Sequence, residues 1–355
     1  MTAPPKSLLD LTLELLAIPS VIGNERAIAD AVETRLRSLA ARVVRHQNSL
    51  AAFGPRRGKP LVALVGHLDT VAAAEEAAFV PRLEGARIVG LGSSDMKGAI
   101  ACDLWILEHL DLSALDLDLA WVLYEKEEGP IADNGLLPLI EAVPELREVD
   151  LAICGEPTDN AVQLGCMGSA HARVVFTGRA AHSARPWQGE NAVHKAAGML
   201  SALASRAPRE VMLDGLPFRE VISATLAHGG RSRNVVPDRF ELNLNIRFAA
   251  GRSRANVEAE VRALASEASE VNWIDFAPAA PPRGDHALVR RLVQRTGAAV
   301  EPKQAWTDVA QLSQIGIAAV NFGPGEQAQA HQRGESISVE LLGNGLELRR
   351  KFLGG

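Results

Sequence analysis

The fold is decided by the stretch Leu61-Val62-Ala63-Leu64-Val65-Gly66-His67-Leu68-Asp69. Residues 61–65 form an uninterrupted apolar run, which is typical of a parallel strand that is buried on both faces. His67 and Asp69 follow it directly. In open α/β sheets, ligands bind beyond the carboxyl ends of such strands. The stretch therefore predicts a parallel sheet with a histidine and an aspartate at its ligand-binding edge.

Further candidate metal ligands recur downstream, and with His67 three of the sites lie just past apolar runs. They are Asp95 in Gly92–Gly98, Glu127 and Glu128 after Leu119–Tyr124, Glu156 after Leu151–Gly155, and His331 near the C-terminus. A set of His, Asp and Glu side chains gathered at one sheet edge is what a site for two hydrolytic metal ions needs.

The length and the pattern of elements predict two domains. A chain of 355 residues exceeds the size at which one core keeps growing. Strands and helices alternate over residues 1–168 and again over 283–355, which predicts an α/β domain with a mixed, mostly parallel sheet and helices on both faces. Strict alternation in Phe240–Phe248 predicts an antiparallel sheet for residues 169–282. We expect this inserted α+β domain to have the ferredoxin-like order β-α-β-β-α-β.

The composition excludes several classes of protein. The net charge is −6 and basic residues form no stripe, which argues against nucleic acid as a partner. Apolar runs are too short to span a membrane, and the first residues lead into an amphipathic helix rather than a signal peptide. Three cysteines, an odd number, indicate reduced core residues. We therefore expect a soluble, cytoplasmic protein that acts on small molecules.

Each candidate ligand also has a plain structural explanation. A lone His-x-Asp pair is usually unremarkable, but here the Asp69 carboxylate is spaced to orient His67 as a metal ligand. Asp95 is either the N-cap of the helix that follows it or a carboxylate that bridges two metals. Glu127 and Glu128 form either an exposed acidic turn or a pair in which one carboxylate binds the metal and the other takes a proton from water.

The inserted domain carries candidates for substrate contacts. His182 lies close to Arg185 and is either a structural or exposed histidine or a hydrogen-bond donor to an oxyanion. Arginine suits bidentate contact with carboxylates. The alternative for each arginine taken singly is a solvated charge on the protein surface. The other candidates for binding carboxylates are Arg231, Arg233, Asn234, Arg247 and Arg333.

The ordered motifs resemble a known family over essentially the whole chain. The motifs are Gly66–Val71, Gly92–Gly98, Glu127–Gly129, Gly155–Thr158, Gly178–Pro186 and His331. They resemble those of the di-zinc aminoacylase and carboxypeptidase G-type metallopeptidases. The resemblance implies a catalytic domain with two zinc ions, for which Co²⁺ can substitute. It also implies that the inserted domain is a lid through which the chain forms a homodimer.

The resemblance also assigns roles by position. His67 and Glu156 would hold one zinc, Glu128 and His331 the other, and Asp95 would bridge them. The catalytic residues would be Glu127 as general acid and base, Asp69, and His182 reaching into the partner subunit's site. The substrate would be bound by Arg185, Asn234, Arg247 and Thr307.

Within the family, several segments resemble actinobacterial enzymes that remove the succinyl group from N-succinyl-LL-2,6-diaminopimelate. They are Ala181–Lys195, Arg233–Asp238, Trp306–Val309 and Val320–Gly325. The expected substrate is therefore a small N-acyl amino acid with two carboxylates. The chain departs from the family at Lys126 and at Trp306-Thr307, which bears on the acyl group rather than on hydrolysis. The alternatives are deacylation of another N-acyl amino acid, such as acetylornithine, and a non-catalytic metal-binding scaffold, against which the intact Glu127 argues.

Overall fold

The computed structural model describes residues 4–72 and 80–354, which form two compact units. The catalytic unit comprises Met1–Gly165, Arg283–Glu301 and Thr307–Gly355, and the inserted unit comprises Cys166–Pro282 and Pro302–Trp306. The predicted boundaries, after residues 168 and 282, differ from this division in two places. The inserted unit begins three residues earlier than predicted, and it also contains residues 302–306.

Hydrogen bonds explain why residues 302–306 belong to the inserted unit. The indole N–H of Trp306 donates to the carbonyl oxygen of Pro278 at 3.1 Å. The Gln304 side chain accepts from the Arg219 N–H at 3.1 Å and donates to the Pro217 carbonyl at 3.0 Å. A contact of this kind between segments far apart in sequence leaves no local pattern, so sequence analysis placed the segment in the wrong domain.

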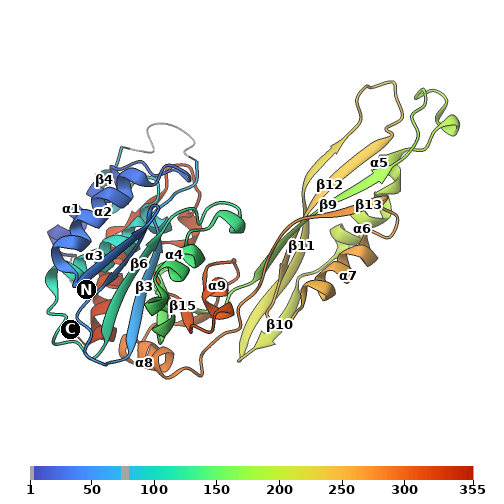
Figure 1. Ribbon diagram of the computed structural model, residues 1–355. Helices are drawn as coiled ribbons and strands as arrows, with labels where there is room; N and C mark the ends of the chain where they lie inside the picture. The colour runs from blue at the N-terminus through green and yellow to red at the C-terminus, as the bar shows by residue number, and fades with distance from the viewer. Residues whose placement is uncertain (1–3, 73–79, 355) are drawn as a thin grey trace. The chain divides into compact units, whose positions relative to one another are not determined.

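The catalytic unit is built on an eight-stranded mixed sheet (Figure 1). Its strands, in spatial order, are β1 (Arg42–His46), β2 (Ser49–Phe53), β6 (Asp118–Tyr124), β3 (Leu61–His67), β7 (Leu151–Cys154), β15 (Ala319–Asn321), β8 (Val162–Leu164) and β14 (Val300–Pro302). The central strands β6, β3, β7 and β15 are parallel, whereas β2 and β8 join them antiparallel. The predicted α/β class is confirmed.

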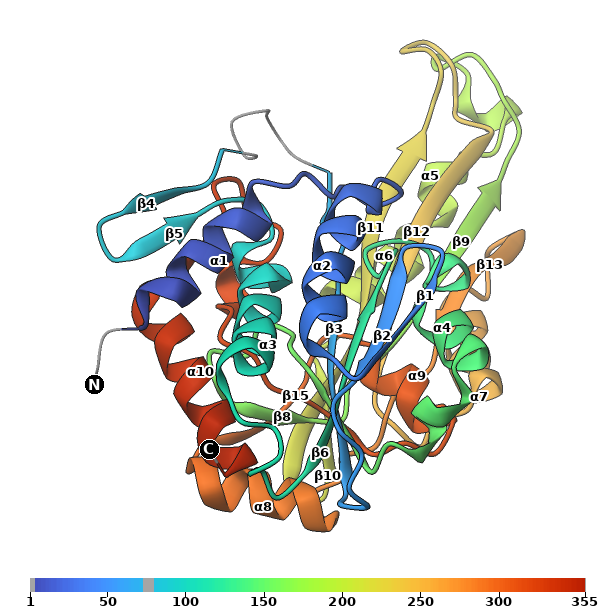
Figure 2. The same ribbon diagram turned by 60° about the vertical axis from the view of Figure 1, so that its left-hand side comes forward.

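Helices pack on both faces of this sheet (Figure 2). They are α1 (Lys6–Leu16), α2 (Arg26–Leu39), α3 (Gly98–His109), α4 (Leu136–Ala142), α8 (Ala287–Thr296), α9 (Val309–Gln314) and α10 (Val339–Leu353). The apolar run of β3 is continuous because helices cover both faces of the strand. Ala63 and Val65 face α4 and α9, whereas Gly66 faces Ile100 of α3. All seven residues of β3 are buried. Among the described helices, none has both the length and the apolar character needed to cross a membrane.

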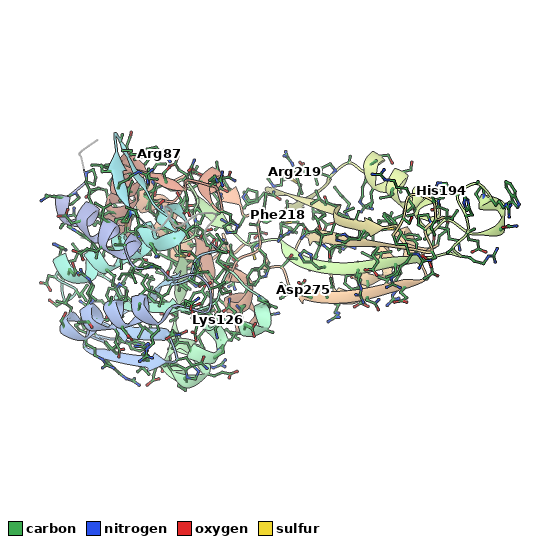
Figure 3. The ribbon with its side chains drawn as sticks, turned by 90° about the horizontal axis from the view of Figure 1, so that it is seen from above. Arg87, Lys126, His194, Phe218, Arg219 and Asp275 are labelled. Carbon is green, nitrogen blue, oxygen red and sulfur yellow. The ribbon has the colours of Figure 1, made fainter. Side chains whose placement is uncertain are left out.

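A small three-stranded sheet lies beside the main one in the catalytic unit. Its strands, in spatial order, are β16 (Ser336–Ser338), β5 (Arg87–Val89) and β4 (Arg82–Glu84). Arg87, labelled in Figure 3, donates to the side chain of Ser336 at 2.9 Å and pairs with Glu326. This sheet therefore holds the segment that follows His331.

The inserted unit is a five-stranded antiparallel sheet covered by three helices. Its strands, in spatial order, are β10 (Arg209–Leu213), β11 (Leu216–Gly229), β12 (Arg239–Phe248), β9 (Gly168–Thr177) and β13 (Glu270–Ala277), and its helices are α5 (Ala192–Lys195), α6 (Ala197–Ser205) and α7 (Arg254–Leu264). The predicted ferredoxin-like order is present with one strand more, β10, which pairs with β11 at the sheet edge.

The alternation in β12 has the predicted cause. Phe240, Leu244 and Phe248 are buried in the core with residues of α5, α6 and α7. Asn243 and Asn245 have the opposite parity and are only partly buried. One face of the sheet is thus covered by helices, and the other carries polar side chains.

Candidate metal centre

Three neighbouring parallel strands bring the candidate ligands to one edge of the sheet. Strand β3 pairs in parallel with β6 on one side and with β7 on the other. Because these strands run the same way, the residues after them leave the sheet at the same edge. His67 ends β3, Glu127 and Glu128 follow β6, and Glu156 follows β7. The position of each side chain is therefore a consequence of strand order.

The carboxylate of Asp95 lies between two histidines. Its Oδ1 is 3.2 Å from Nε2 of His67, and its Oδ2 is 3.5 Å from Nε2 of His331. His331 Nε2 is also 3.0 Å from Oε1 of Glu128. His67 and Asp95 are buried, whereas the His331 side chain is 54% exposed. Two oxygens of one carboxylate thus face two different imidazoles, which is the arrangement of a bridging ligand.

Two donor sets share Asp95, and a third group joins His67 to Glu127 and Glu128. The possible ligand atoms of His67, Asp95 and Glu156 all lie within 4.8 Å of one another, and so do those of Asp95, Glu128 and His331. Imidazole nitrogens and carboxylate oxygens are ligands that zinc and similar divalent ions accept. The residues present therefore fit two metal ions. Their roles as ligands stay a prediction.

The turn that carries Asp95 is not a helix cap. Helix α3 begins at Gly98 with Lys97 as its N-cap, and Asp95 lies before it in the segment Ser93–Lys97. The expectation that Asp95 is either an N-cap or a bridging ligand is thus resolved against the N-cap. Its backbone is extended, with φ −124° and ψ 87°.

The carboxylate of Asp69 lies beside His67 and also holds the glutamate turn. The nearer partner of His67 Nδ1 is the main-chain carbonyl of Asp69 at 3.1 Å, whereas Oδ1 of the side chain is 3.6 Å away. The carboxylate also accepts from the backbone N–H groups of Glu127 at 3.0 Å and Glu128 at 2.9 Å. Two donors in a turn satisfy it, so Asp69 orients the glutamate pair more directly than the histidine.

The glutamate turn has an uncommon backbone. Lys126, labelled in Figure 3, has φ 61°, which is left-handed and rare for a residue other than glycine. His331 also has φ 61°. Such conformations persist only where the surroundings hold them, and they concentrate at functional sites.

The pKa of the Glu127 carboxyl group is strongly shifted. Burial raises the pKa of Glu127 well above its ordinary value, and the charges of Glu156, Asp308 and Glu128 raise it further against the opposing effect of His67. A carboxyl group that readily takes up a proton beside a metal site is suited to general acid–base catalysis.

Sequence analysis missed a buried network behind Glu127. The hydroxyl of Tyr124, the single tyrosine of the chain, donates to the carboxylate of Asp308, and Nδ2 of Asn134 donates to it at 3.1 Å. Asp308 is also the N-cap residue of α9. Thr307, predicted to bind substrate, is buried next to it in the catalytic unit. A lone tyrosine at a strand end was the signal available in the sequence.

Glu335 was also missed. Its buried carboxylate accepts from the backbone N–H groups of Gly92, Ser94 and Asp95 at 2.8, 2.8 and 2.9 Å. Burial raises the pKa of Glu335 to about 7 although these hydrogen bonds oppose the shift. Its position four residues after His331 was the signal that the sequence offered.

The structure brings His182, Arg185 and Asn234 together in the inserted unit. The Ser183 N–H donates to the carbonyl of Asn234 at 2.9 Å, and Nδ1 of His182 accepts from the Ala184 N–H at 3.0 Å. All three predicted residues are exposed. They form one polar group at the loops next to the ends of β9 and β12.

Arg247 does not belong to that group. On β12 it pairs with Ser169, at the opposite end of the strand from Arg239, which pairs with Thr177. Its Nε donates to Oδ1 of Asn245 at 3.1 Å. Arg231 and Arg233 lie in the same loop as Asn234, and Arg231 is 3.7 Å from Asp238, whereas Arg333 follows His331 in the catalytic unit.

Comparison with known proteins identifies the family. The model of Peptidase family M20/M25/M40 matches residues 63–354. The chain belongs to this family. A succinyl-diaminopimelate desuccinylase of Corynebacterium glutamicum is 36% identical over 352 residues, 97% of this chain and 95% of the relative. A Mycobacterium tuberculosis protein with a provisional name for the same activity is 37% identical over 350 residues, 98% of each chain.

Solved structures of M20 proteins share the fold. A metallo-carboxypeptidase of Sulfolobus solfataricus gives a TM-score of 0.80 at 18% identity, covering 98% of this chain and 99% of the other. The YXEP protein of Bacillus subtilis, described as a dinuclear metal binding peptidase, gives a TM-score of 0.69 at 15% identity over 98% and 96% of the two chains. These likenesses confirm the fold class of an M20 chain.

Proposed function

We propose that this M20 chain is a metal-dependent amide hydrolase that removes the succinyl group from N-succinyl-LL-2,6-diaminopimelate. The products are succinate and diaminopimelate, a precursor of lysine. The observation that carries the hydrolase class is Asp95, whose two oxygens face His67 and His331. The choice of substrate is supported by the desuccinylase of Corynebacterium glutamicum, which aligns with 97% of this chain.

The proposed metals are two zinc ions, which Co²⁺ can replace. His67, Asp95 and Glu156 would hold one ion, and Asp95, Glu128 and His331 the other. When bound, such a pair supplies Lewis-acid polarisation of the amide carbonyl and lowers the pKa of water. The mixed nitrogen and oxygen donors support zinc, because magnesium and calcium favour oxygen ligands.

The chain's own residues would move the protons. Glu127 takes the proton of the attacking water and then gives it to the leaving amine nitrogen. Burial and the carboxylates around it raise its pKa, which favours the first step, uptake of the proton. Asp69 fixes the turn, because its carboxylate holds the N–H groups of Glu127 and Glu128. His182 donates a hydrogen bond to the oxyanion that forms at the carbonyl.

The substrate's two carboxylates require cationic and polar partners. For this role we propose Arg185, Asn234, Arg247 and Thr307. Burial lowers the pKa of Arg247, with the charge of Asp275 opposing the shift. Its guanidinium nevertheless stays charged, since arginine is not deprotonated in proteins. A partly desolvated guanidinium is a strong partner for a carboxylate.

We also propose that the chain acts as a homodimer through the inserted unit, with His182 serving the partner subunit's metal centre. The exposed position of His182 supports this role. The polar face of the sheet that contains β12 supports an interface with a second copy. In a two-fold dimer, each subunit would complete the other's site in the same way.

A second candidate substrate is acetylornithine. An acetylornithine deacetylase of Myxococcus xanthus is 30% identical over 305 residues, 81% of this chain. The departures at Lys126 and at Trp306-Thr307 lie in segments that bear on acyl-group choice, so this alternative keeps the same metal centre and the same Glu127.

The proposal is tested by measuring succinate release from N-succinyl-LL-2,6-diaminopimelate. The purified chain should be active, should lose activity after treatment with a chelator, and should regain it with Zn²⁺ or Co²⁺. Activity that persists in protein shown to be metal-free would overturn the metal-dependent mechanism. Activity on acetylornithine alone would keep the hydrolase and replace the substrate.

A further inference from the structure

Glu335 ties together two turns that are far apart in the sequence. Its Oε1 accepts from Ser94 and Asp95, and its Oε2 accepts from Gly92. Both oxygens are therefore used, and the side chain is 3% exposed. Three backbone donors that converge on one buried carboxylate form a strong, charge-assisted contact. This contact fixes the turn that ends in Asp95.

The main chain of Glu335 adds to the connection. Its carbonyl accepts from the Gly90 N–H at 2.9 Å, and its N–H donates to the carbonyl of Gln332 at 3.2 Å. The second bond closes the turn of residues 332–335, which directly follows His331. One residue thus holds the Asp95 turn with its side chain and closes the turn after His331 with its backbone.

The two metal subsites differ in how their ligands are supported. His67 ends β3, and Glu156 lies two residues after β7, so both are placed by the hydrogen-bonded sheet. Asp95 and His331 lie in turns outside the sheet, and His331 has a left-handed backbone. The subsite that contains His331 therefore depends more on contacts between turns.

We propose that Glu335 is a positioning residue that sets the metal affinity of the subsite formed by Asp95, Glu128 and His331. It does so by fastening the Asp95 turn to the His331 turn. The inference rests on the proposed two-metal site. It assigns Glu335 no contact with substrate or metal.

The test is metal binding by the metal-free Glu335→Gln variant. The amide keeps the size of the carboxylate but turns an NH₂ group toward one of the backbone donors. The metal-free protein is titrated with Zn²⁺ in competition with a coloured chelator. Wild type should bind two ions tightly. The variant should bind the ion of the His331 subsite about 10- to 100-fold more weakly, as is usual when a partner of a ligand is removed. The other ion should be weakened less, because it shares Asp95 but is also held by His67 and Glu156 at the ends of β3 and β7.

The affected subsite is identified with a second substitution. In a His331→Ala background, Glu335→Gln should cause little further loss of affinity, because both changes act on the same ion. In a His67→Ala background, it should still weaken the remaining ion. If Glu335 only stabilised the fold in general, Glu335→Gln would weaken metal binding to the same extent in both backgrounds.

A matched control is Glu220→Gln in the inserted unit. Glu220 is also buried and accepts a backbone N–H, that of Ala249, at 2.8 Å. This variant should keep two tight ions whatever its effect on thermal stability. Glu335→Asp, which keeps the charge with a shorter reach, should give an intermediate affinity and serves if the glutamine variant does not fold.

The outcomes separate this inference from the proposed function. If wild type does not bind two ions, the two-metal site itself is wrong. If wild type binds two and Glu335→Gln binds both unchanged, or weakens both equally, the role of Glu335 is overturned. It is also overturned if neither Glu335 variant folds without metal, because Glu335 would then support the whole unit.

Discussion

Glu127 lies among other carboxylates, and this setting determines its chemistry. Burial and the charges of Glu156, Asp308 and Glu128 raise its pKa. We predict that Glu127→Gln lowers kcat by about 10²- to 10⁴-fold, the usual contribution of a general acid–base group. The metal content should stay at the wild-type value, because every proposed ligand remains. Activity and metal analysis on the same preparation check both parts.

The neighbouring residue is the matched control. Glu128→Gln removes a carboxylate one position along the same turn, and it should weaken one of the two metal ions, because Glu128 lies 3.0 Å from His331. A loss of metal from Glu127→Gln comparable to that from Glu128→Gln would show that the roles are exchanged.

His331 gives the metal affinity a predictable pH dependence. Its hydrogen bond to Glu128 raises the pKa of His331 to about 9, with burial opposing the shift. In the metal-free protein at pH 7 the imidazole is therefore protonated, and an arriving metal ion must displace that proton. Affinity should increase as the pH rises toward 9 and level off above it.

Calorimetry can count that proton. Zinc binding at pH 7, measured in buffers with different heats of ionisation, should release at least one proton per subunit. The count should fall in His331→Ala, which lacks the group. A wild-type count near zero, or affinity that falls between pH 7 and 9 in buffers that do not bind zinc, would contradict the assignment of His331.

The strand-end residues could be predicted from the sequence, because strand order alone brings His67, Glu127, Glu128 and Glu156 to one sheet edge. Contacts between residues that are far apart in the sequence could not be predicted. Tyr124 and Asp308 are 184 residues apart, and Glu335 and Asp95 are 240 apart. The hydrogen bonds that the backbone N–H groups of Glu127 and Glu128 donate to Asp69 were not predicted either, because they depend on the path of a turn 58 residues away.

At the scale of elements, the long periodic segments were predictable, whereas several of the short ones were not. Strand β12 runs over Arg239–Phe248, close to the predicted Phe240–Phe248. Strands β8, β10 and β14 were missed, since each has three to five residues and forms through its neighbours rather than through its own pattern. The helical segment that follows β9 is divided into α5 and α6.

Two strand ends approach closely beside the metal centre. A Cβ added at Gly323, just after β15, would lie 2.2 Å from the carbonyl oxygen of Gly155 and 2.3 Å from that of Glu156. We predict that Gly323→Ala lowers the free energy of unfolding by about 1–3 kcal/mol, as overpacking usually does. It should also weaken the ion held by Glu156, because the clash involves the backbone of that residue.

Gly284 supplies a control in the same unit. A Cβ there would meet only Leu164, at the ordinary distance of 3.4 Å. Gly284→Ala should change the free energy of unfolding by no more than about 0.5 kcal/mol. Urea denaturation of the metal-free variants compares the two, and equal effects would mean that the close approach of β7 and β15 is not needed.

At the scale of the whole molecule, the proposed dimer makes the two subunits interdependent. His182→Ala and Glu127→Ala should each be inactive. If His182 serves the partner subunit, a mixed dimer contains one site with both residues intact and one with neither. Random exchange should then restore about a quarter of wild-type activity, because half of the dimers are mixed and half of their sites are whole. No recovery after demonstrated subunit exchange would rule out the arrangement.

The most direct test of the proposed activity is a comparison of two substrates with the zinc-loaded chain. N-succinyl-LL-2,6-diaminopimelate carries an acyl carboxylate that acetylornithine lacks. A buried pair between such a carboxylate and an arginine is worth a few kcal/mol, so kcat/KM should be at least about 10²-fold higher for the succinyl substrate. A higher kcat/KM for acetylornithine, or no metal-dependent turnover of the succinyl substrate, would contradict the proposed function.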